Sequence, residues 1–235
     1  FYDDDGTYIG YIPYSVDYYR PSINGDKYYS RISRLKMALI PMFANPRTGF
    51  GEEVALTKYK IGLGSFFGGS RSGGGQIDAP IADLTEQNRI SLIYKIAGLQ
   101  PSTYTPIANA YAAAGGYMLG TGSSSYSSPM PTVPNQCDGY GVYFLTDGEP
   151  NSVYQESDTK NLMTTSLGTA SLSISSPSLN SAQAYYESGI DPRTRANVGK
   201  PGWNLIGEYA KALNTNQNLK KDAIATATVG FGSVY

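Results

Sequence analysis

Asp147 and Thr105 are the residues whose types and positions best suit the binding of a hard cation. Asp147 directly follows residues 140–146, a short apolar run typical of a buried parallel strand. Thr105 precedes Pro106 and occupies the N-cap position of a predicted helix. In open α/β sheets, ligands bind beyond the carboxyl ends of the strands, so a carboxylate and a hydroxyl at these places can converge on one ion. Taken singly, each also has a simpler explanation, as a turn-forming Asp-Gly and as a helix cap.

The scarcity of histidine and cysteine restricts the chemistry further. The chain has no His, and Cys137 is its only Cys. Ser-His-Asp and Cys-His catalysis are therefore excluded within the chain, and so is a zinc site built from the usual Cys and His ligands. A metal held here must bind oxygen atoms, which favours Mg²⁺, Ca²⁺ or Mn²⁺. We expect Cys137 itself to be buried and inert, with pairing outside the chain as the alternative.

Length, charge and hydropathy narrow the classes of protein. The 235 residues suffice for one sizeable α/β domain without disulfide bonds, and 40% of them are apolar. The formal net charge is −1 and no run of Lys or Arg stands out, so nucleic-acid binding is not expected. No apolar stretch approaches the roughly 20 residues that span a bilayer. The chain opens on Phe1 without a signal peptide, which is compatible with a piece of a longer protein truncated at both ends.

Hydrophobic periodicity predicts alternating helices and strands. Helices are expected over 27–43 with Asp26 as cap, over 85–97 with Thr85 as cap, from 105 onward, near 181–187 and over 203–213; strands are expected over 59–64, 140–146 and 224–229. The first two helices are expected to bury Ile32, Leu35, Ala38, Leu39 and Met42, and Ile90, Ile93, Tyr94 and Ala97. A Tyr-rich insertion over 8–29, a flexible Gly/Ser loop over 65–76 and an irregular insertion over 148–200 lie between them. This order predicts one α/β domain over residues 1–235, with a doubly wound, mostly parallel central sheet flanked by helices and long loop insertions.

Two motifs carry a resemblance to a known family. Residues 142–151, Val-Tyr-Phe-Leu-Thr-Asp-Gly-Glu-Pro-Asn, resemble the third metal-site motif of von Willebrand factor A-type domains. Residues 102–110, Ser-Thr-Tyr-Thr-Pro-Ile-Ala-Asn-Ala, resemble the second motif, which supplies a Thr. Their order fits, and residues 228–232 resemble the family's late sheet strand. The likeness covers most of residues 27–235 and is greatest to the A domain of the PilY/PilC-type adhesins at type IV pilus tips.

The resemblance implies a function as well as a Rossmann-like fold. In this family, hydroxyls and carboxylates hold one divalent cation in a metal-ion-dependent adhesion site (MIDAS) with one coordination position open. An acidic side chain of a protein ligand fills that position. We therefore expect a non-enzymatic adhesion module on the bacterial cell surface, at the pilus tip or outer membrane. Its expected partners are a host or matrix protein and type IV pilus components.

The first motif of the family departs from its usual form. The family has Asp-x-Ser-x-Ser at the end of a central strand, whereas the candidate here is residues 3–7, Asp-Asp-Asp-Gly-Thr, which would offer Asp3, Asp5 and Thr7 as ligands. Only Phe1 and Tyr2 precede it, so the alternative is a true motif upstream, with residues 3–7 in the Tyr-rich insertion. A third carboxylate would weaken the pull of the cation on a ligand carboxylate, so coordination by Asp5 would favour a purely structural metal.

Two other functions remain open at this point. Residues 3–7 also resemble the Asp-x-Asp-Gly-Thr nucleophile loop of haloacid-dehalogenase-type phosphotransferases, but that family needs an apolar strand before the motif and a later Lys. The other alternative is a structural spacer of the same fold without a working metal site, in which exposed tyrosines recognise proteins. The Gly-rich residues 68–75 lack the Gly-Lys-Ser/Thr of a phosphate-binding loop.

Overall fold

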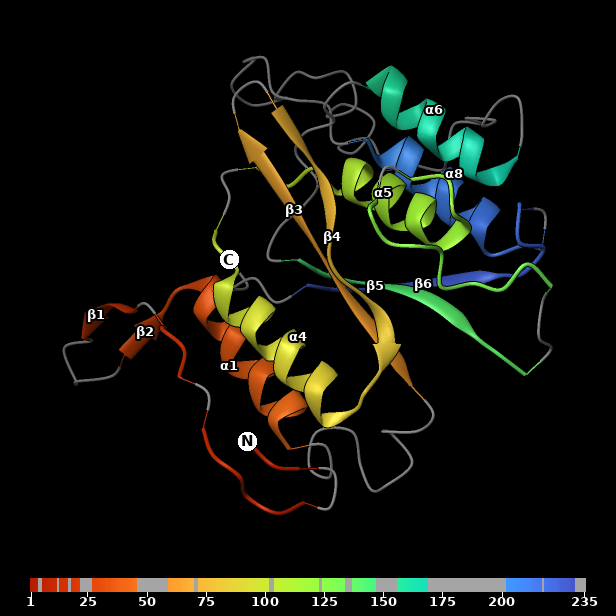
Figure 1. Cartoon of the computed structure of the whole chain (residues 1–235). Helices are drawn as coiled ribbons and strands as arrows, with labels where there is room; N and C mark the ends of the chain where they lie inside the picture. The colour runs from red at the N-terminus through yellow and green to blue at the C-terminus, as the bar shows by residue number, and fades with distance from the viewer. Residues whose placement is uncertain are drawn as a thin grey trace, which may run out of the picture. The chain divides into compact units, whose positions relative to one another are not determined.

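The computed structural model describes residues 1–3, 6–11, 13–16, 18–21, 27–45, 59–69, 72–101, 104–122, 124–133, 137–146, 156–168, 202–216 and 218–230. The chain divides into two compact units (Figure 1). The first comprises Phe1–Leu63 and Asp78–Pro101, and the second comprises Gly64–Ile77 and Ser102–Tyr235. The boundary falls inside both strands of one hairpin, and we describe each unit by itself.

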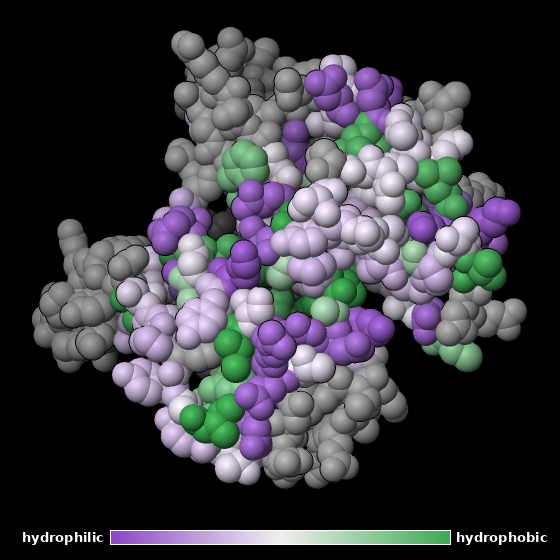
Figure 2. All heavy atoms as spheres, viewed as in Figure 1, coloured by the Kyte–Doolittle hydropathy of each residue, from purple (hydrophilic) through white to green (hydrophobic). Residues whose placement is uncertain are grey.

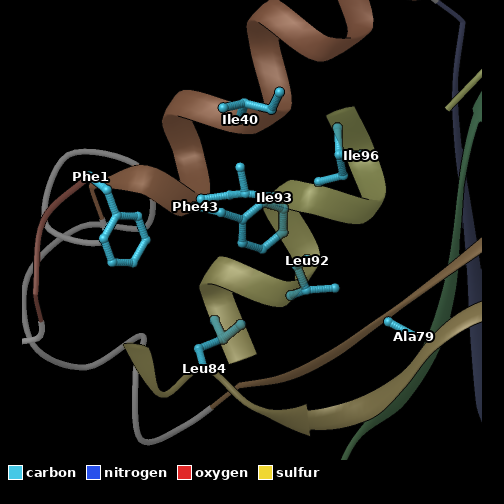
Figure 3. Close-up of a cluster of buried hydrophobic side chains, with 8 residues drawn as sticks. All are labelled: Phe1, Ile40, Phe43, Ala79, Leu84, Leu92, Ile93 and Ile96. Carbon is cyan, nitrogen blue, oxygen red and sulfur yellow. The ribbon is translucent and has the colours of Figure 1, made fainter. Parts of the chain in front are cut away.

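The first unit is built on two helices that pack against each other, α1 (Arg31–Ala44) and α4 (Glu86–Gly98). Each has a side-chain cap: the Ser30 hydroxyl accepts from the amide of Ser33 at 3.3 Å, and the Thr85 hydroxyl accepts from the amide of Asn88 at 3.4 Å. Side chains of both helices join residues from outside them, Phe1, Ala79 and Leu84, in a buried apolar cluster (Figure 3). The cluster contains Phe1, Ile40, Phe43, Ala79, Leu84, Leu92, Ile93 and Ile96.

The predicted faces of these helices are only partly right: Ile93 is fully buried, and Leu39, Met42, Ile90 and Ala97 pack against the core from its margin, but the most buried positions lie one residue to the side. The buried residues are Ser33, Lys36, Ile40 and Phe43 in α1 and Arg89, Leu92, Ile93 and Ile96 in α4. Tyr94, predicted inside, is 59% exposed. The reason is that polar residues take core places here, which a purely apolar pattern cannot identify. The first helix also begins later than predicted, since Lys27–Tyr29 form strand β2, which pairs antiparallel with β1 (Tyr18–Pro21). Asp26, its predicted cap, lies outside the described residues.

The Gly-rich segment forms a hairpin of long strands and not a flexible loop. Strands β3 (Lys60–Gly69) and β4 (Ser72–Asp83) pair with each other and run in opposite directions (Figure 1). Glycine is needed where backbones approach closely: a Cβ at Gly62 would lie 2.9 Å from the carbonyl oxygen of Ala79. In the second unit, a Cβ at Gly75 would lie 3.1 Å from the Cβ of Ala110 in a neighbouring helix. The glycines therefore serve close packing between elements.

The second unit contains a parallel strand pair and three helices. Strands β5 (Tyr140–Thr146) and β6 (Ile224–Gly230) pair in parallel, in register from Tyr140↔Ile224 to Thr146↔Gly230. Helices α5 (Ile107–Leu119), α6 (Glu156–Leu167) and α8 (Trp203–Leu213) pack against one another, and α8 also packs against β6. The predicted strands at 140–146 and 224–229 and the predicted helix at 203–213 are confirmed.

The fold class is therefore mixed α/β with one parallel pair. Within the described ranges, every sheet has two strands, and no central doubly wound sheet is shown. One side of β5 is exposed at Gly141 and Tyr143, so its predicted burial on both faces is wrong for these residues. Cys137 is likewise exposed and not buried.

Helix α6 lies inside the stretch predicted to be irregular. It buries Thr159, Thr164 and Ser166 beside Met163 and Leu167, so its inward face is only partly apolar and its periodicity is weak. The helix predicted near 181–187 lies outside the described residues. Among the helices that the structure describes, none combines the length and hydropathy required to cross a bilayer.

Candidate functional site

The predicted metal ligands are distributed over both units. Asp3 and Thr7 belong to the first unit and Thr105 to the second. Asp5 and Asp147 lie outside the described residues, so their part of the prediction stays a prediction. In the part of the chain that is described, no group of three His, Cys, Asp or Glu side chains is placed to hold a metal ion.

The carboxyl ends of β5 and β6 meet at one edge. Because the two strands are parallel and in register, their last residues, Thr146 and Gly230, are directly paired. The Thr146 side chain is buried. Asp147 follows it in the sequence, so this edge is the part of the fold to which the predicted carboxylate is attached. Strand ends of this kind are where open α/β proteins bind ligands.

Thr105 does not cap α5, contrary to the prediction. The N-cap position is held by Pro106, which makes no side-chain capping bond, and the helix begins at Ile107. The Thr105 carbonyl accepts from the amide of Ile107 at 2.9 Å, which closes a turn just before the helix. Thr105 is half-buried.

Tyr111 joins the beginning of α5 to the strand pair. Its ring packs edge-to-face on Phe144 of β5 with centroids 5.2 Å apart, and its hydroxyl is hydrogen-bonded to that of Thr226 in β6. Burial raises the pKa of Tyr111 to about 12, against a smaller lowering by the Thr226 hydrogen bond. Tyr111 is in the second turn of the helix, and Phe144 is two residues before the strand end. The start of α5 and the end of β5 thus belong to one packed group.

The opposite edge of the strand pair carries its own carboxylate. The Tyr140 hydroxyl donates to Asp138 Oδ2 at 3.4 Å beside the first residue of β5. Desolvation, followed by the negative charge of Asp138, raises the pKa of Tyr140. Asp138 is exposed. It therefore provides a carboxylate at the amino end of the strand whose carboxyl end precedes Asp147.

Asp3 and Thr7, the described ends of the first candidate motif, are joined by hydrogen bonds in the first unit. Asp3 Oδ1 accepts from the amide of Thr7 at 2.7 Å, and the amide of Asp3 donates to the carbonyl of Thr7 at 3.0 Å. Gly6 adopts a positive φ of 81°, and Tyr2 and Tyr8 form an isolated antiparallel bridge around the turn. The structure thus brings Asp3 and Thr7 together, and the Asp3 carboxylate stabilises the turn.

A contact between two helices was not foreseen from the sequence. Asn109 Nδ2 in the first turn of α5 donates to Thr159 Oγ1 in the first turn of α6 at 2.8 Å. Local sequence patterns give little signal for it, because the inward face of α6 mixes polar and apolar residues. The residues are 50 positions apart, so only tertiary folding brings them together.

On the face shown in Figure 2, the described residues form no broad apolar patch. In Figure 2, the described hydrophobic residues appear as small groups separated by hydrophilic ones. Large exposed apolar side chains such as Tyr11 and Val133 are each more than 70% accessible and belong to different units. Scattered apolar residues of this kind are normal on protein surfaces.

Comparison with known proteins finds no matching family model, no matching curated protein and no matching solved structure. The likeness to von Willebrand factor A-type domains therefore depends on the two motifs and on the elements that carry them.

Proposed function

We propose that the chain is an adhesion module that binds a protein ligand through one divalent cation, held in a MIDAS-like site by Thr105 and Asp147. The observation that supports it best is the in-register parallel pairing of β5 and β6 up to Thr146↔Gly230, with α5 packed on the pair through Tyr111. The segment before Asp147 and the helix after Thr105 consequently belong to one packed group.

The donor chemistry fits a hard cation. Thr105 supplies a hydroxyl oxygen and Asp147 a carboxylate, and the chain has no His to offer a softer cation. With one carboxylate from this unit, a divalent ion keeps net positive charge. That charge attracts an acidic side chain of a partner to the open coordination position. Coordination by Asp3, Asp5 and Thr7 stays a prediction, since Asp3 already closes its own turn.

The biological setting in this proposal follows from the motif resemblance. It comprises a bacterial cell-surface location at the pilus tip or outer membrane, type IV pilus components as neighbours and a host or matrix protein as ligand. The adhesive step is tested by binding the chain to a panel of coated matrix proteins. Both EDTA and Asp147→Ala should abolish binding, whereas binding that persists in EDTA contradicts a cation bridge.

Thermal melting with EDTA, Mg²⁺, Ca²⁺ or Mn²⁺ tests the cation site directly. A cation that binds only the folded state at 100 times its Kd stabilises it by about 2.7 kcal/mol, so Tm should rise by roughly 5–10 °C. Asp147→Ala should remove this rise, and Thr105→Val should reduce it. The matched control is Asp138→Ala, which removes an exposed carboxylate from the other end of the same strand and should keep the rise.

The alternatives give different outcomes in the same experiment. A wild-type chain whose Tm is the same in EDTA and in every cation would be a spacer without a working metal site. If the chain hydrolysed a phosphate ester, this result would instead support the phosphotransferase alternative. An equal loss of response in Asp138→Ala and Asp147→Ala would place the cation somewhere other than the carboxyl edge.

A further inference from the structure

Helix α1 carries a lysine on its buried face. Lys36 is only 6% exposed and lies one helical turn after Ser33, which is 1% exposed. Among the described residues, none forms a hydrogen bond or an ion pair with Lys36. A buried ammonium group without a counter-ion is unfavourable, because it gives up hydration without gaining an attractive partner. This position therefore suits an anion.

Helix geometry directs the Lys36 side chain toward the N-terminal end of α1. Residues three apart share one face of a helix, and helical side chains lean toward the helix N-terminus. Lys36 thus follows Ser33 on the same face, and Ser33 Oγ is 2.8 Å from Oγ of the cap residue Ser30. The ammonium group and the two hydroxyl groups consequently succeed one another along a single face that leads to the helix start.

The same end of α1 holds a second positive group. Arg34 Nε donates to the carbonyl of Tyr29, the residue before the cap, at 3.3 Å, which places the exposed guanidinium beside the helix start. The first turn of α1 contains no acidic residue. Positive side chains at this end oppose the helix dipole, whereas an anion there is stabilised by the dipole and by the first-turn amides. The side chains and the backbone therefore favour the same kind of ligand.

We propose that the N-terminal end of α1 binds a phosphate group, held by the Lys36 ammonium, the Arg34 guanidinium and the first-turn amides. Every residue in this site is described and belongs to the first unit, so the inference does not depend on the proposed cation site. Arginine and lysine bind phosphate oxygens through charge-assisted hydrogen bonds. A carboxylate ligand, with one charge and two oxygens, would satisfy fewer of these donors.

The test titrates inorganic phosphate into the chain in EDTA and follows the Tm, with sodium chloride at equal ionic strength as the reference. Phosphate should raise the Tm of the wild type beyond this reference, because it binds the folded state. Lys36→Met keeps an unbranched apolar stem but removes the charge, and should weaken the apparent phosphate affinity about 10-fold or more. The matched control Lys95→Met removes an exposed charge from α4 and should keep the wild-type affinity.

Four results would overturn the proposal. One is a Tm rise in phosphate no larger than that in sodium chloride. A second is equal weakening in Lys36→Met and Lys95→Met, since phosphate would then respond only to net charge. A third is a Lys36→Met chain with a lower Tm but the wild-type phosphate affinity, because the lysine would then only stabilise helix packing. The fourth applies if Lys36→Met does not fold: Arg34→Gln, at an exposed position, must then show a loss of about 10-fold. Because the titration runs in EDTA, its failure leaves the proposed cation site untouched.

Discussion

The two units stabilise their interiors in different ways, one with a buried charge and the other with buried hydroxyl groups. In the first unit, the fully buried Arg89 donates from Nη1 to the carbonyl of Phe43 and from Nη2 to the carbonyl of Tyr2, both at 3.0 Å. Its guanidinium carbon also lies 4.7 Å from the ring centroid of Phe1. One long side chain thereby ties α4, the end of α1 and the first residues into one core.

The second unit uses aromatic rings that reach through gaps left by glycine. Tyr209 of α8 packs edge-to-face on Tyr111 with centroids 5.0 Å apart, and its hydroxyl is 2.6 Å from that of Ser166 in α6. The Ser166 hydroxyl donates onward to the carbonyl of Met163 at 2.7 Å. Burial raises the pKa of Tyr209, so its hydroxyl stays protonated and able to donate.

This difference indicates what each interior tolerates. The first unit depends on the Arg89 guanidinium, which donates hydrogen bonds to two backbone carbonyls. Losing it leaves those carbonyls buried without donors. The second depends on close approach, so adding even one carbon atom is costly. The predictions below test this contrast in order of decreasing effect.

The largest effect is expected for Arg89→Ala. The substitution leaves a cavity and removes the donors to the carbonyls of Phe43 and Tyr2, which should lower the free energy of unfolding by about 4 kcal/mol. Chemical denaturation followed by circular dichroism measures the change. Arg34→Ala is the control: Arg34 also donates to a backbone carbonyl, that of Tyr29, but it is exposed and should cost less than about 1 kcal/mol. If the two substitutions lowered the free energy of unfolding equally, the burial of Arg89 would contribute nothing to stability.

A smaller loss is expected for Gly115→Ala in the second unit. The added Cβ would overlap the Tyr209 hydroxyl and lie 2.7 Å from its Cζ, which should cost about 2–3 kcal/mol. Gly207→Ala is the matched control within α8, because a Cβ there meets nothing within 4 Å. It should stabilise the chain by about 0.5–1 kcal/mol through helix propensity. Adding Tyr209→Phe to Gly115→Ala should recover part of the loss; no recovery would mean that the clash is not with the Tyr209 hydroxyl.

The smallest effect is expected for Tyr111→Phe, and it depends on pH. At neutral pH the tyrosine is protonated in both the folded and the unfolded state, and the substitution should cost about 1 kcal/mol for the lost hydrogen bond to Thr226. The folded pKa is about 12 and the ordinary value is 10.0. The unfolded chain therefore loses the proton first, and this residue reduces stability by up to about 1.4 kcal/mol per pH unit above pH 10.

Denaturation curves between about pH 9 and about pH 11.5 measure that slope. Tyr111→Phe should lose stability less steeply than the wild type as the pH rises. Parallel slopes for the two proteins would contradict burial of Tyr111 as the cause. Tyr143→Phe, on the exposed side of β5, controls for the loss of a hydroxyl and should change the stability at neutral pH by less than about 0.5 kcal/mol.

Local sequence patterns were sufficient to predict those elements that form without help from residues distant in the chain. The apolar run at Tyr140–Thr146 and the helix at Trp203–Leu213 were predicted with their observed bounds, and Thr85 was predicted correctly as a cap. Strand periodicity, helix periodicity and capping are properties of a few consecutive residues, which explains this success. The alternation of element types predicted parallel strands, and β5 and β6 are parallel, but the sequence did not identify them as partners.

Tertiary contacts decided the remainder. The glycines between 62 and 75 become strand because backbones and a helix approach closely there, and α6 forms although threonines and a serine line its buried face. Arg89 enters a core because carbonyls and a ring from distant segments surround it. Among the proposed ligands, the sequence alone selected Thr105 by its motif, whereas only the structure showed that Pro106 holds the cap position and that Asn109 reaches Thr159. The physical reason is the same in each case: the deciding energy lies in contacts between residues far apart in the chain, which a local pattern does not contain.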